Sequence, residues 1–202
     1  MLDNLQGYHL ILASNSPRRN ELLGGLGLEY SVRVLKDADE SYPVELKGAD
    51  VAIYIAMQKA EAFRPQIGPD DLIITADTIV CQGTEIFGKP TDREDALRML
   101  KALSGQSHFV FTGVCLTSNN DQVSFLAETE VFFCELSDAE IKHYVDQCKP
   151  YDKAGAYGVQ EWIGFVGVER IEGSYFNVMG LPVHQLYTEL KRFPPNPKTS
   201  KP

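Results

Sequence analysis

The sequence predicts an α/β protein whose sheet contains both parallel and antiparallel strands. In the first half of the chain, short apolar runs alternate with segments of helical periodicity, a pattern typical of parallel strands joined by helices. Two long apolar runs, at 108–117 and 123–136, then follow each other across the turn residues 119–121 (Asn-Asn-Asp). Such a pair indicates an antiparallel hairpin, so we expect a mixed sheet.

The first strand is expected at residues 9–12, and a helix follows it after a polar turn. Ser16 stands where an N-cap hydroxyl belongs, and Pro17 suits the first helical position because no N–H is needed there. Arg18 and Arg19 then lie in the first turn, where free backbone N–H groups already favour an anion. This corner predicts either a phosphate-binding site or a capped surface helix with two solvated arginines.

The remaining elements follow from apolar periodicity and from residues that begin or end helices. Capping boxes at 91–94 (Thr-Asp-Arg-Glu) and 137–140 (Ser-Asp-Ala-Glu) predict two helix starts. In chain order we expect a strand at 29–35, a helix at 48–63, a strand at 72–80, a helix ending at 103, the two hairpin strands, a helix ending near 147, a strand at 162–172 and a helix at 181–192.

No repeat or linker-like segment interrupts the chain, so we expect one domain over residues 1–193. The ten residues from position 193 contain four prolines. We therefore expect residues 194–202 to form a disordered or loosely attached tail.

Composition excludes several classes of protein. The 202 residues are 44% hydrophobic and 23% charged, which is ordinary for a globular protein. No apolar run approaches the roughly 18 residues of a membrane span, and no secretory signal is visible, so we expect a cytoplasmic protein without a membrane partner. The net charge of −9 argues against binding of long nucleic acid, but a few convergent cations could still hold a small anion. The cysteines and histidines show neither a CxxC pair nor metal-ligand spacing.

Asp77 is a candidate for chemistry because it interrupts an apolar strand, with isoleucines at 73–74 before it and an Ile-Val pair at 79–80 after it. A carboxylate among buried neighbours is costly unless it is paired or bound to a cation. The residue is therefore predicted to be a metal ligand or a general base at the edge of a cleft. The alternative is a structural aspartate bonded to the backbone.

Two further candidates flank the predicted helix at 48–63. Glu40 lies with Asp37 and Asp39 in an acidic loop, a usual place for oxygen ligands to Mg²⁺, although a solvated loop is the simpler interpretation. Lys59 lies beside the apolar stripe of the helix and would ordinarily extend its ammonium to solvent at the rim. It gains significance if the ligand is a polyphosphate.

Residues 83–89 match the GxxxxGK half of a P-loop, but we reject that interpretation. Position 90 is proline instead of Ser or Thr, and the spacer holds bulky residues at 85–87. A hairpin that places Lys89 at a pocket rim fits better.

The segment 152–160 combines small residues with a cation and an amide. Its glycines allow close backbone approach, Lys153 could hold phosphate, and Gln160 could read a base edge. The alternative is a tight loop that only reverses the chain. The later segments 173–177 and 180–182 have the residues of turns that precede a helix, and we assign them no catalytic role.

Taken in order, these segments resemble the Maf family of nucleoside triphosphate pyrophosphatases. The resemblance covers residues 10–190, and its joint order and spacing make it specific. The matching segments are 12–19 (LASNSPRR), 21–23 (ELL), 59–60 (KA), 76–80 (ADTIV), 88–90 (GKP), 103–105 (LSG), 112–114 (TGV), 152–160 (DKAGAYGVQ), 173–175 (GSY) and 180–182 (GLP).

The resemblance implies a fold like that of inosine triphosphate pyrophosphatases: an elongated mixed sheet flanked by helices, with two lobes around a central cleft. It implies hydrolysis between the α and β phosphates of a nucleoside triphosphate, a divalent cation (Mg²⁺ or Mn²⁺) as cofactor, and a homodimer. Arg18, Thr78 and Gln160 fall with the branch that acts on dTTP and UTP, to which we add modified pyrimidine triphosphates.

The resemblance also implies roles for the candidate residues. Glu40 and Asp77 would hold the metal, and Asp77 would take the proton from the attacking water. Phosphate and base contacts would come from Ser14, Ser16, Arg18, Arg19, Lys59, Thr78, Lys89, Lys153 and Gln160. The alternatives are a non-catalytic nucleotide-binding regulator of cell division and a phosphatase that releases the γ phosphate.

Overall fold

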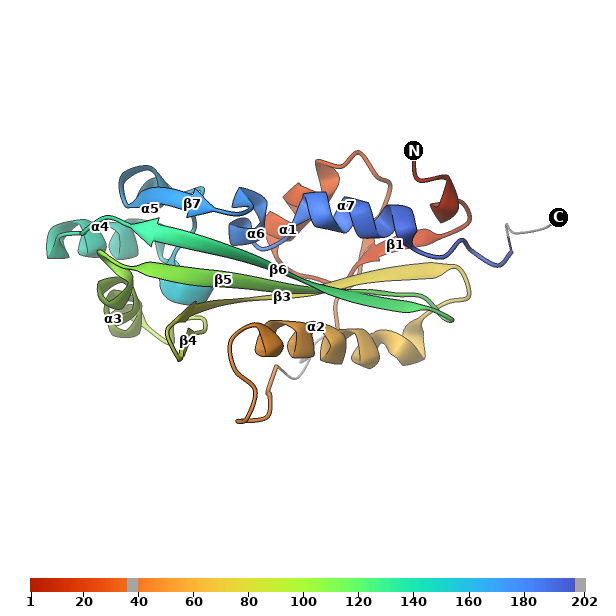
Figure 1. Ribbon diagram of the computed structural model, residues 1–202, viewed down its shortest axis with the longest axis horizontal. Coiled ribbons are helices and arrows are strands. Elements are labelled where there is room, and N and C mark those ends of the chain that lie inside the picture. Colours follow the sequence, from red (N-terminus) through yellow and green to blue (C-terminus); the bar gives the residue numbers. More distant parts are fainter. Residues whose placement is uncertain (36–39, 199–202) are drawn as a thin grey trace.

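Three long strands run side by side along the length of the molecule (Figure 1). They are β3 (Asp71–Gln82), β5 (Ser107–Thr117) and β6 (Gln122–Phe133), and each neighbouring pair is antiparallel. The computed structural model describes residues 1–35 and 40–198.

Four shorter strands complete a seven-stranded sheet in the order β2-β1-β3-β5-β6-β7, with β4 paired to β3. The pairings of β1 with β2 and with β3 are parallel, and the others are antiparallel, so the predicted mixed sheet is confirmed. The shorter strands are β1 (His9–Leu12), β2 (Ser31–Val32), β4 (Glu85–Phe87) and β7 (Val168–Glu172).

Helices cover both faces of the sheet (Figure 1). The helix α2 packs across β3, β5 and β6 on one face, while α1, α6 and α7 lie on the other, and α3 packs against α4 at one end. The elongated α/β architecture flanked by helices is therefore as predicted. The helices are α1 (Pro17–Gly24), α2 (Ala49–Phe63), α3 (Arg93–Leu103), α4 (Asp138–Cys148), α5 (Trp162–Val166), α6 (Tyr175–Met179) and α7 (Val183–Arg192), with 3₁₀ turns at Asp3–Leu5, Arg64–Gln66 and Ala154–Ala156.

A glycine on β5 lets α2 approach the sheet closely. A Cβ atom on Gly113 would lie 2.4 Å from the carbonyl oxygen of Ala52 in α2. No side chain fits there, so the helix backbone rests on the strand itself. This contact fixes α2, and with it Lys59, relative to Asp77, whose register partner on β5 is Gly113.

The structure corrects the strand expected at 162–172. Its first part is the helix α5, and only Val168–Glu172 is a strand. Short apolar runs suit a strand or a buried helix equally well. Here Gly164 decides, because a Cβ at this position would lie 1.7 Å from the oxygen of Val159. The run can fold back tightly on the preceding loop only because the residue lacks a side chain.

Smaller differences concern element ends. The strand expected at 29–35 pairs with β1 over Ser31 and Val32 alone. The cap of α3 is Asp92, whose side chain accepts from Asp95 N, and not Thr91. Two overlapping cap patterns one residue apart made that start ambiguous. The second capping box, at Ser137, is formed as predicted.

The described part of the tail differs from the loose attachment expected for it. Asn196 is 1% exposed, and its side-chain amide donates to Gly7 O at 2.9 Å and to Asp70 Oδ1 at 3.2 Å. Lys198 also pairs with Asp70 at 2.7 Å. Short polar side chains thus anchor a proline-rich segment that has little apolar surface to bury. Residues 199–202 lie outside the described part of the chain.

Candidate functional site

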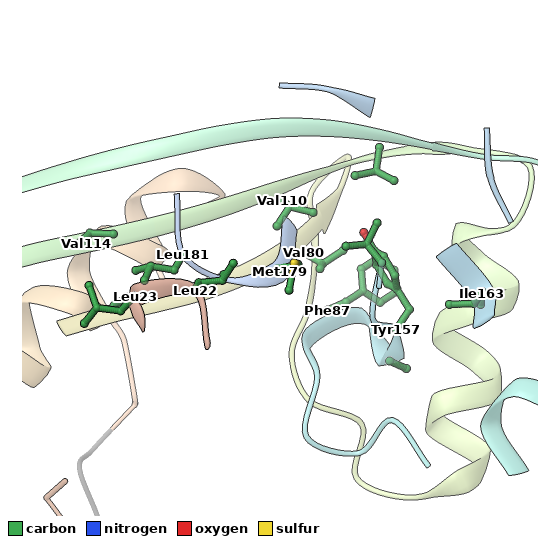
Figure 2. Packing of buried hydrophobic residues seen from close by; sticks show 14 of the residues in the cluster. Leu22, Leu23, Val80, Phe87, Val110, Val114, Tyr157, Ile163, Met179 and Leu181 are labelled. Carbon is green, nitrogen blue, oxygen red and sulfur yellow. The ribbon is translucent and has the colours of Figure 1, made fainter. Parts of the chain in front are cut away.

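A cavity of about 730 Å³ opens between the start of α1, the middle of β3, the inner face of α2 and the loop that contains residues 152–160. Apolar side chains form part of its wall, among them Val80, Val110 and Met179, which belong to the packed cluster in Figure 2. Every predicted site residue lines this one cavity: Ser14, Ser16, Arg18, Arg19, Glu40, Lys59, Asp77, Thr78, Lys89, Lys153 and Gln160. Asp37 and Asp39 lie outside the described residues.

The turn between β1 and α1 is built as the sequence predicts. Ser16 is the N-cap of α1, and its hydroxyl accepts from the backbone N–H of Arg19 at 3.4 Å. Its own N–H donates to Ser14 Oγ at 3.2 Å, and Pro17 is the first residue of the helix. The two serines and the first turn of the helix therefore face the cavity in a defined conformation.

Arg19 is clamped by the protein itself. Its Nε donates to Gly180 O at 2.8 Å, its Nη1 to Ala76 O at 2.9 Å and to Ser14 Oγ at 3.5 Å, and its Nη2 to Thr78 Oγ1 at 3.0 Å. These bonds use four of the five N–H groups of the guanidinium. Burial lowers the pKa of Arg19, an effect that the charge of Asp77 opposes. The guanidinium is therefore a positively charged planar group held in one orientation in the cavity wall.

Arg18 reaches the opposite loop instead. Its Nη1 donates to Asp152 Oδ2 at 2.7 Å, and the other oxygen of that carboxylate accepts from Lys153 Nζ at 2.8 Å. Burial would raise the pKa of Asp152, but the hydrogen bonds from Lys153 and Arg18 and their charges lower it to about 2. One carboxylate thus gathers two cations at the cavity edge.

Lys59 stands between the two predicted acids. Its ammonium lies 2.7 Å from Asp77 Oδ1 and 2.8 Å from Glu40 Oε1. Lys89 approaches the other oxygen of Glu40 at 3.6 Å. Partial burial would raise the pKa of Glu40, but the hydrogen bond from Lys59 and the nearby positive charges lower it overall. Both carboxylates therefore point at one common position inside the cavity.

The donor set at this position suits a hard divalent cation. Magnesium is usually held by one or two carboxylates, while waters and substrate phosphate oxygens complete its shell. Glu40 and Asp77 supply two such carboxylates, and they already converge on a positive group. Among residues 1–35 and 40–198, no group of three or more His, Cys, Asp or Glu side chains is placed to hold a metal ion. The two carboxylates alone would thus leave most of a cation's coordination shell to other ligands.

Gln160 carries an unmet hydrogen-bond acceptor. Its Oε1 atom is buried and has no partner among the described residues, although the residue lines the cavity. Buried amide oxygens are nearly always bonded, so an unpaired one beside a cavity suits a ligand donor. Thr78, by contrast, has a hydroxyl that is already hydrogen-bonded to Arg19 and to Thr112 Oγ1, the latter at 2.9 Å. Thr78 therefore helps to hold Arg19 in place.

Sequence reasoning missed several groups that hold the site together. They are Asp152, Glu161 and the carbonyls of Ala76 and Gly180. Gly180 has a φ of +114° and ends α6, so its glycine marks a special backbone position that aims a carbonyl at Arg19. For Asp152 the signal was its place directly before Lys153. Nothing local indicated that Asp152 would also pair with Arg18, which lies 134 residues away in the chain.

No helix in the described part of the chain is long and apolar enough to cross a membrane.

The chain matches the model of a family described as "Maf-like protein" over residues 9–193. A dTTP/UTP pyrophosphatase of Phocaeicola vulgatus is 59% identical over 192 residues, which cover 95% of this chain and all of the relative. The protein of the same name from Bacteroides thetaiotaomicron is 57% identical with the same coverage, and that of Flavobacterium johnsoniae is 44% identical over 93% of this chain and 96% of the relative. Among solved structures, a HAM1 protein from Coxiella burnetii gives a TM-score of 0.47 at 15% identity, with 92% of this chain and all of that chain covered.

Proposed function

The chain belongs to the Maf-like protein family, and on that premise we propose that it is a nucleoside triphosphate pyrophosphatase. Its substrates are dTTP, UTP and related modified pyrimidine triphosphates, which it hydrolyses to the monophosphate and pyrophosphate. The observation that carries this proposal is the convergence of two carboxylates and five basic side chains on one cavity. The printed names of the relatives support the same activity.

The basic residues match the charge of a triphosphate tail, which is about four negative charges near neutral pH. Arg18, Arg19, Lys59, Lys89 and Lys153 all line the cavity, although the chain as a whole has a net charge of −9. Cations focused in a cleft attract an anion even when the rest of the surface is acidic. Hydroxyls of Ser14 and Ser16 add neutral donors for phosphate oxygens.

Asp77 is assigned the general-base role. Its Oδ1 accepts from Lys59, which leaves Oδ2 as the atom to take a proton from water that attacks the α phosphorus. Glu40 and Asp77 would together hold Mg²⁺ or Mn²⁺, whose chemistry when bound is to neutralise phosphate oxygens. Arg19, fixed by its four bonds, holds the phosphate chain in register for that attack, and Lys59 and Lys89 offset the charge that develops on the leaving pyrophosphate.

The nucleobase of the substrate is assigned to the part of the cavity formed by the loop that carries Gln160. An amide presents both a donor and an acceptor, and the imide edge of thymine or uracil presents both in return. The buried, unpaired Oε1 of Gln160 would accept from the ring N–H of such a base. We also propose that the enzyme is cytoplasmic and forms a homodimer. Light scattering of the purified protein would test the dimer.

The proposal is tested with a panel of nucleoside triphosphates in Mg²⁺ or Mn²⁺, with both pyrophosphate and inorganic phosphate measured. We expect pyrophosphate from dTTP and UTP, and much slower release from purine triphosphates. Inorganic phosphate as the first product would identify a γ phosphatase instead. Tight binding without any product across several metals would identify a nucleotide-binding regulator. A preference for purines would overturn the assignment of the base.

A further inference from the structure

Lys153 is held from behind by a residue outside the predicted site. Its side chain is 9% exposed, and its ammonium lies 2.9 Å from Glu161 Oε1 and 2.8 Å from Asp152 Oδ1. Asp152 is 58% exposed and also serves Arg18, whereas the side chain of Glu161 is 24% exposed. The more buried carboxylate therefore sets the direction in which Lys153 points.

Tyr144 fixes that carboxylate. It lies fully buried on α4, and its hydroxyl donates to Glu161 Oε2. Burial raises the pKa of the Tyr144 phenol, so the hydroxyl keeps its proton and acts as a donor. The phenol oxygen of Tyr144 also accepts from the backbone N–H of Gly158 at 3.0 Å. One phenol thus holds both the carboxylate and the backbone of the loop.

The loop has little room to move around these bonds. A Cβ atom on Gly158 would lie 2.9 Å from the carboxyl carbon of Glu161 and 3.1 Å from Cε of Lys153. The glycine backbone is therefore packed directly against the ion pair. Gln160 lies between Gly158 and Glu161 in the chain, and Tyr144 bonds both of them, so the backbone that carries Gln160 is held from both sides.

We propose that Tyr144 and Glu161 are positioning residues that hold Lys153 and Gln160 in the geometry needed to bind the nucleotide. This inference rests on the proposed function, since it takes Lys153 and Gln160 as the groups that meet the substrate. Neither Tyr144 nor Glu161 is assigned contact with the reacting atoms. Asp77 and Arg19 belong to β3 and α1, so the attack itself does not depend on this anchor. Loss of the anchor should therefore weaken binding and base selection more than turnover.

The test compares Tyr144→Phe and Glu161→Gln with the wild type. Tyr144→Phe keeps the ring and removes both bonds of the hydroxyl. We expect the KM for dTTP to rise about tenfold while kcat stays within about threefold, and the ratio of kcat/KM for dTTP over dATP to fall at least fivefold. Glu161→Gln should shift the same quantities, because it removes the charge that holds Lys153.

Tyr8→Phe is the matched control. It also removes a buried phenol oxygen, one that has no hydrogen-bond partner among the described residues, and we expect wild-type kinetics. Thermal melting shows whether each variant is folded. A merely structural role would lower the melting temperature or the active fraction, and so kcat, without changing KM or the base ratio. Unchanged KM and base ratio in folded Tyr144→Phe would overturn the proposal.

The double variant Tyr144→Phe/Glu161→Gln adds a stricter test. If both residues act on Lys153 through one shared bond, the double variant should be affected about as much as the worse single variant. KM increases that multiply would contradict a common path.

Binding of α,β-methylene-dTTP, measured by calorimetry, separates this inference from the proposed function. Weaker binding to Tyr144→Phe than to the wild type supports the anchor even if no pyrophosphate is ever released, in which case only the hydrolysis proposal fails. Equal binding to both proteins overturns the anchor even if the wild type hydrolyses dTTP. A wild type that does not bind the analogue overturns both. The single tryptophan, Trp162, directly follows Glu161 and offers a fluorescence readout of the same titration.

Discussion

Two walls of the cavity hold their positive charges in different ways. On one wall, Arg19 is bonded to the carbonyls of Ala76 and Gly180 and to two hydroxyls. On the other, Lys59 contacts only charged partners among the bonds described for it, the carboxylates of Glu40 and Asp77. Neutral backbone partners fix a cation without cancelling its charge. Carboxylate partners neutralise the cation and can themselves bind a metal.

The difference indicates a division of labour. Under the proposed function, the clamped wall around Arg19 would provide a rigid reference for the phosphate chain, because neutral partners leave the positive charge of the guanidinium uncancelled. The acidic wall, formed by Glu40 and Asp77, would provide groups whose charge balance changes if a metal and a triphosphate bind. Substitutions on the acidic wall should therefore affect turnover, while those on the clamped wall should also reduce stability.

The largest effect is expected on the acidic wall. Asp77→Asn removes the proton acceptor and should lower kcat for dTTP by a factor of about 100 or more, with little change in the melting temperature. The matched control is Asp71→Asn on the same strand, since the Asp71 side chain is 13% exposed against 14% for Asp77 and is also paired with basic groups. Asp71→Asn should keep kcat within about threefold. Near wild-type turnover in Asp77→Asn would remove that residue from its assigned role.

The second effect compares the adjacent arginines. Lysine at position 19 cannot reach the four partners of the guanidinium, so Arg19→Lys should lower the free energy of unfolding by about 2 kcal/mol or more. Arg18→Lys loses one bond to a largely exposed carboxylate and should lower the free energy of unfolding by about 0.5 kcal/mol or less. Urea denaturation at neutral pH measures both. Equal losses would contradict the contrast between clamped and carboxylate-held cations.

The third effect concerns an uncharged pair behind the loop that contains residues 152–160. His108 is fully buried and bonds the hydroxyl of Tyr157 at 2.7 Å, and burial lowers its pKa from 6.5 to about 4. Between these pH values the unfolded chain binds more protons than the folded one, so stability rises with pH. From pH 7 to pH 5 the free energy of unfolding should fall by about 2 kcal/mol through this residue.

His108→Gln keeps a polar partner for Tyr157 and should abolish most of that fall. Urea denaturation of both proteins at pH 7 and pH 5 measures it. An equally steep fall in His108→Gln would assign the pH dependence to other groups. Activity at neutral pH should change little, because His108 does not charge in that range when folded.

The sequence predicted those parts of the fold and site that depend on local rules. The cap at Ser16, the box at Ser137 and the long hairpin each follow from neighbouring residues. The apolar strand interrupted by Asp77 likewise pointed to a carboxylate at a cleft, and the structure places it there.

What could not be predicted depends on contacts between distant segments. Tyr144 looks like any core residue on α4, and only the tertiary structure brings its hydroxyl to Glu161. The helix α5 formed where a strand was expected because Gly164 meets Val159 O, a contact that periodicity does not encode. The described part of the tail, up to residue 198, is likewise attached by bonds of Asn196 to distant parts of the chain.

The position of attack is the most direct test of the account, because the cavity is interpreted as a seat that presents the α phosphorus to water beside Asp77. Hydrolysis of dTTP in ¹⁸O-labelled water, followed by mass spectrometry of the products, measures it. Attack at the α phosphorus gives one labelled oxygen in the thymidine monophosphate and unlabelled pyrophosphate. Label in pyrophosphate or in inorganic phosphate would contradict it.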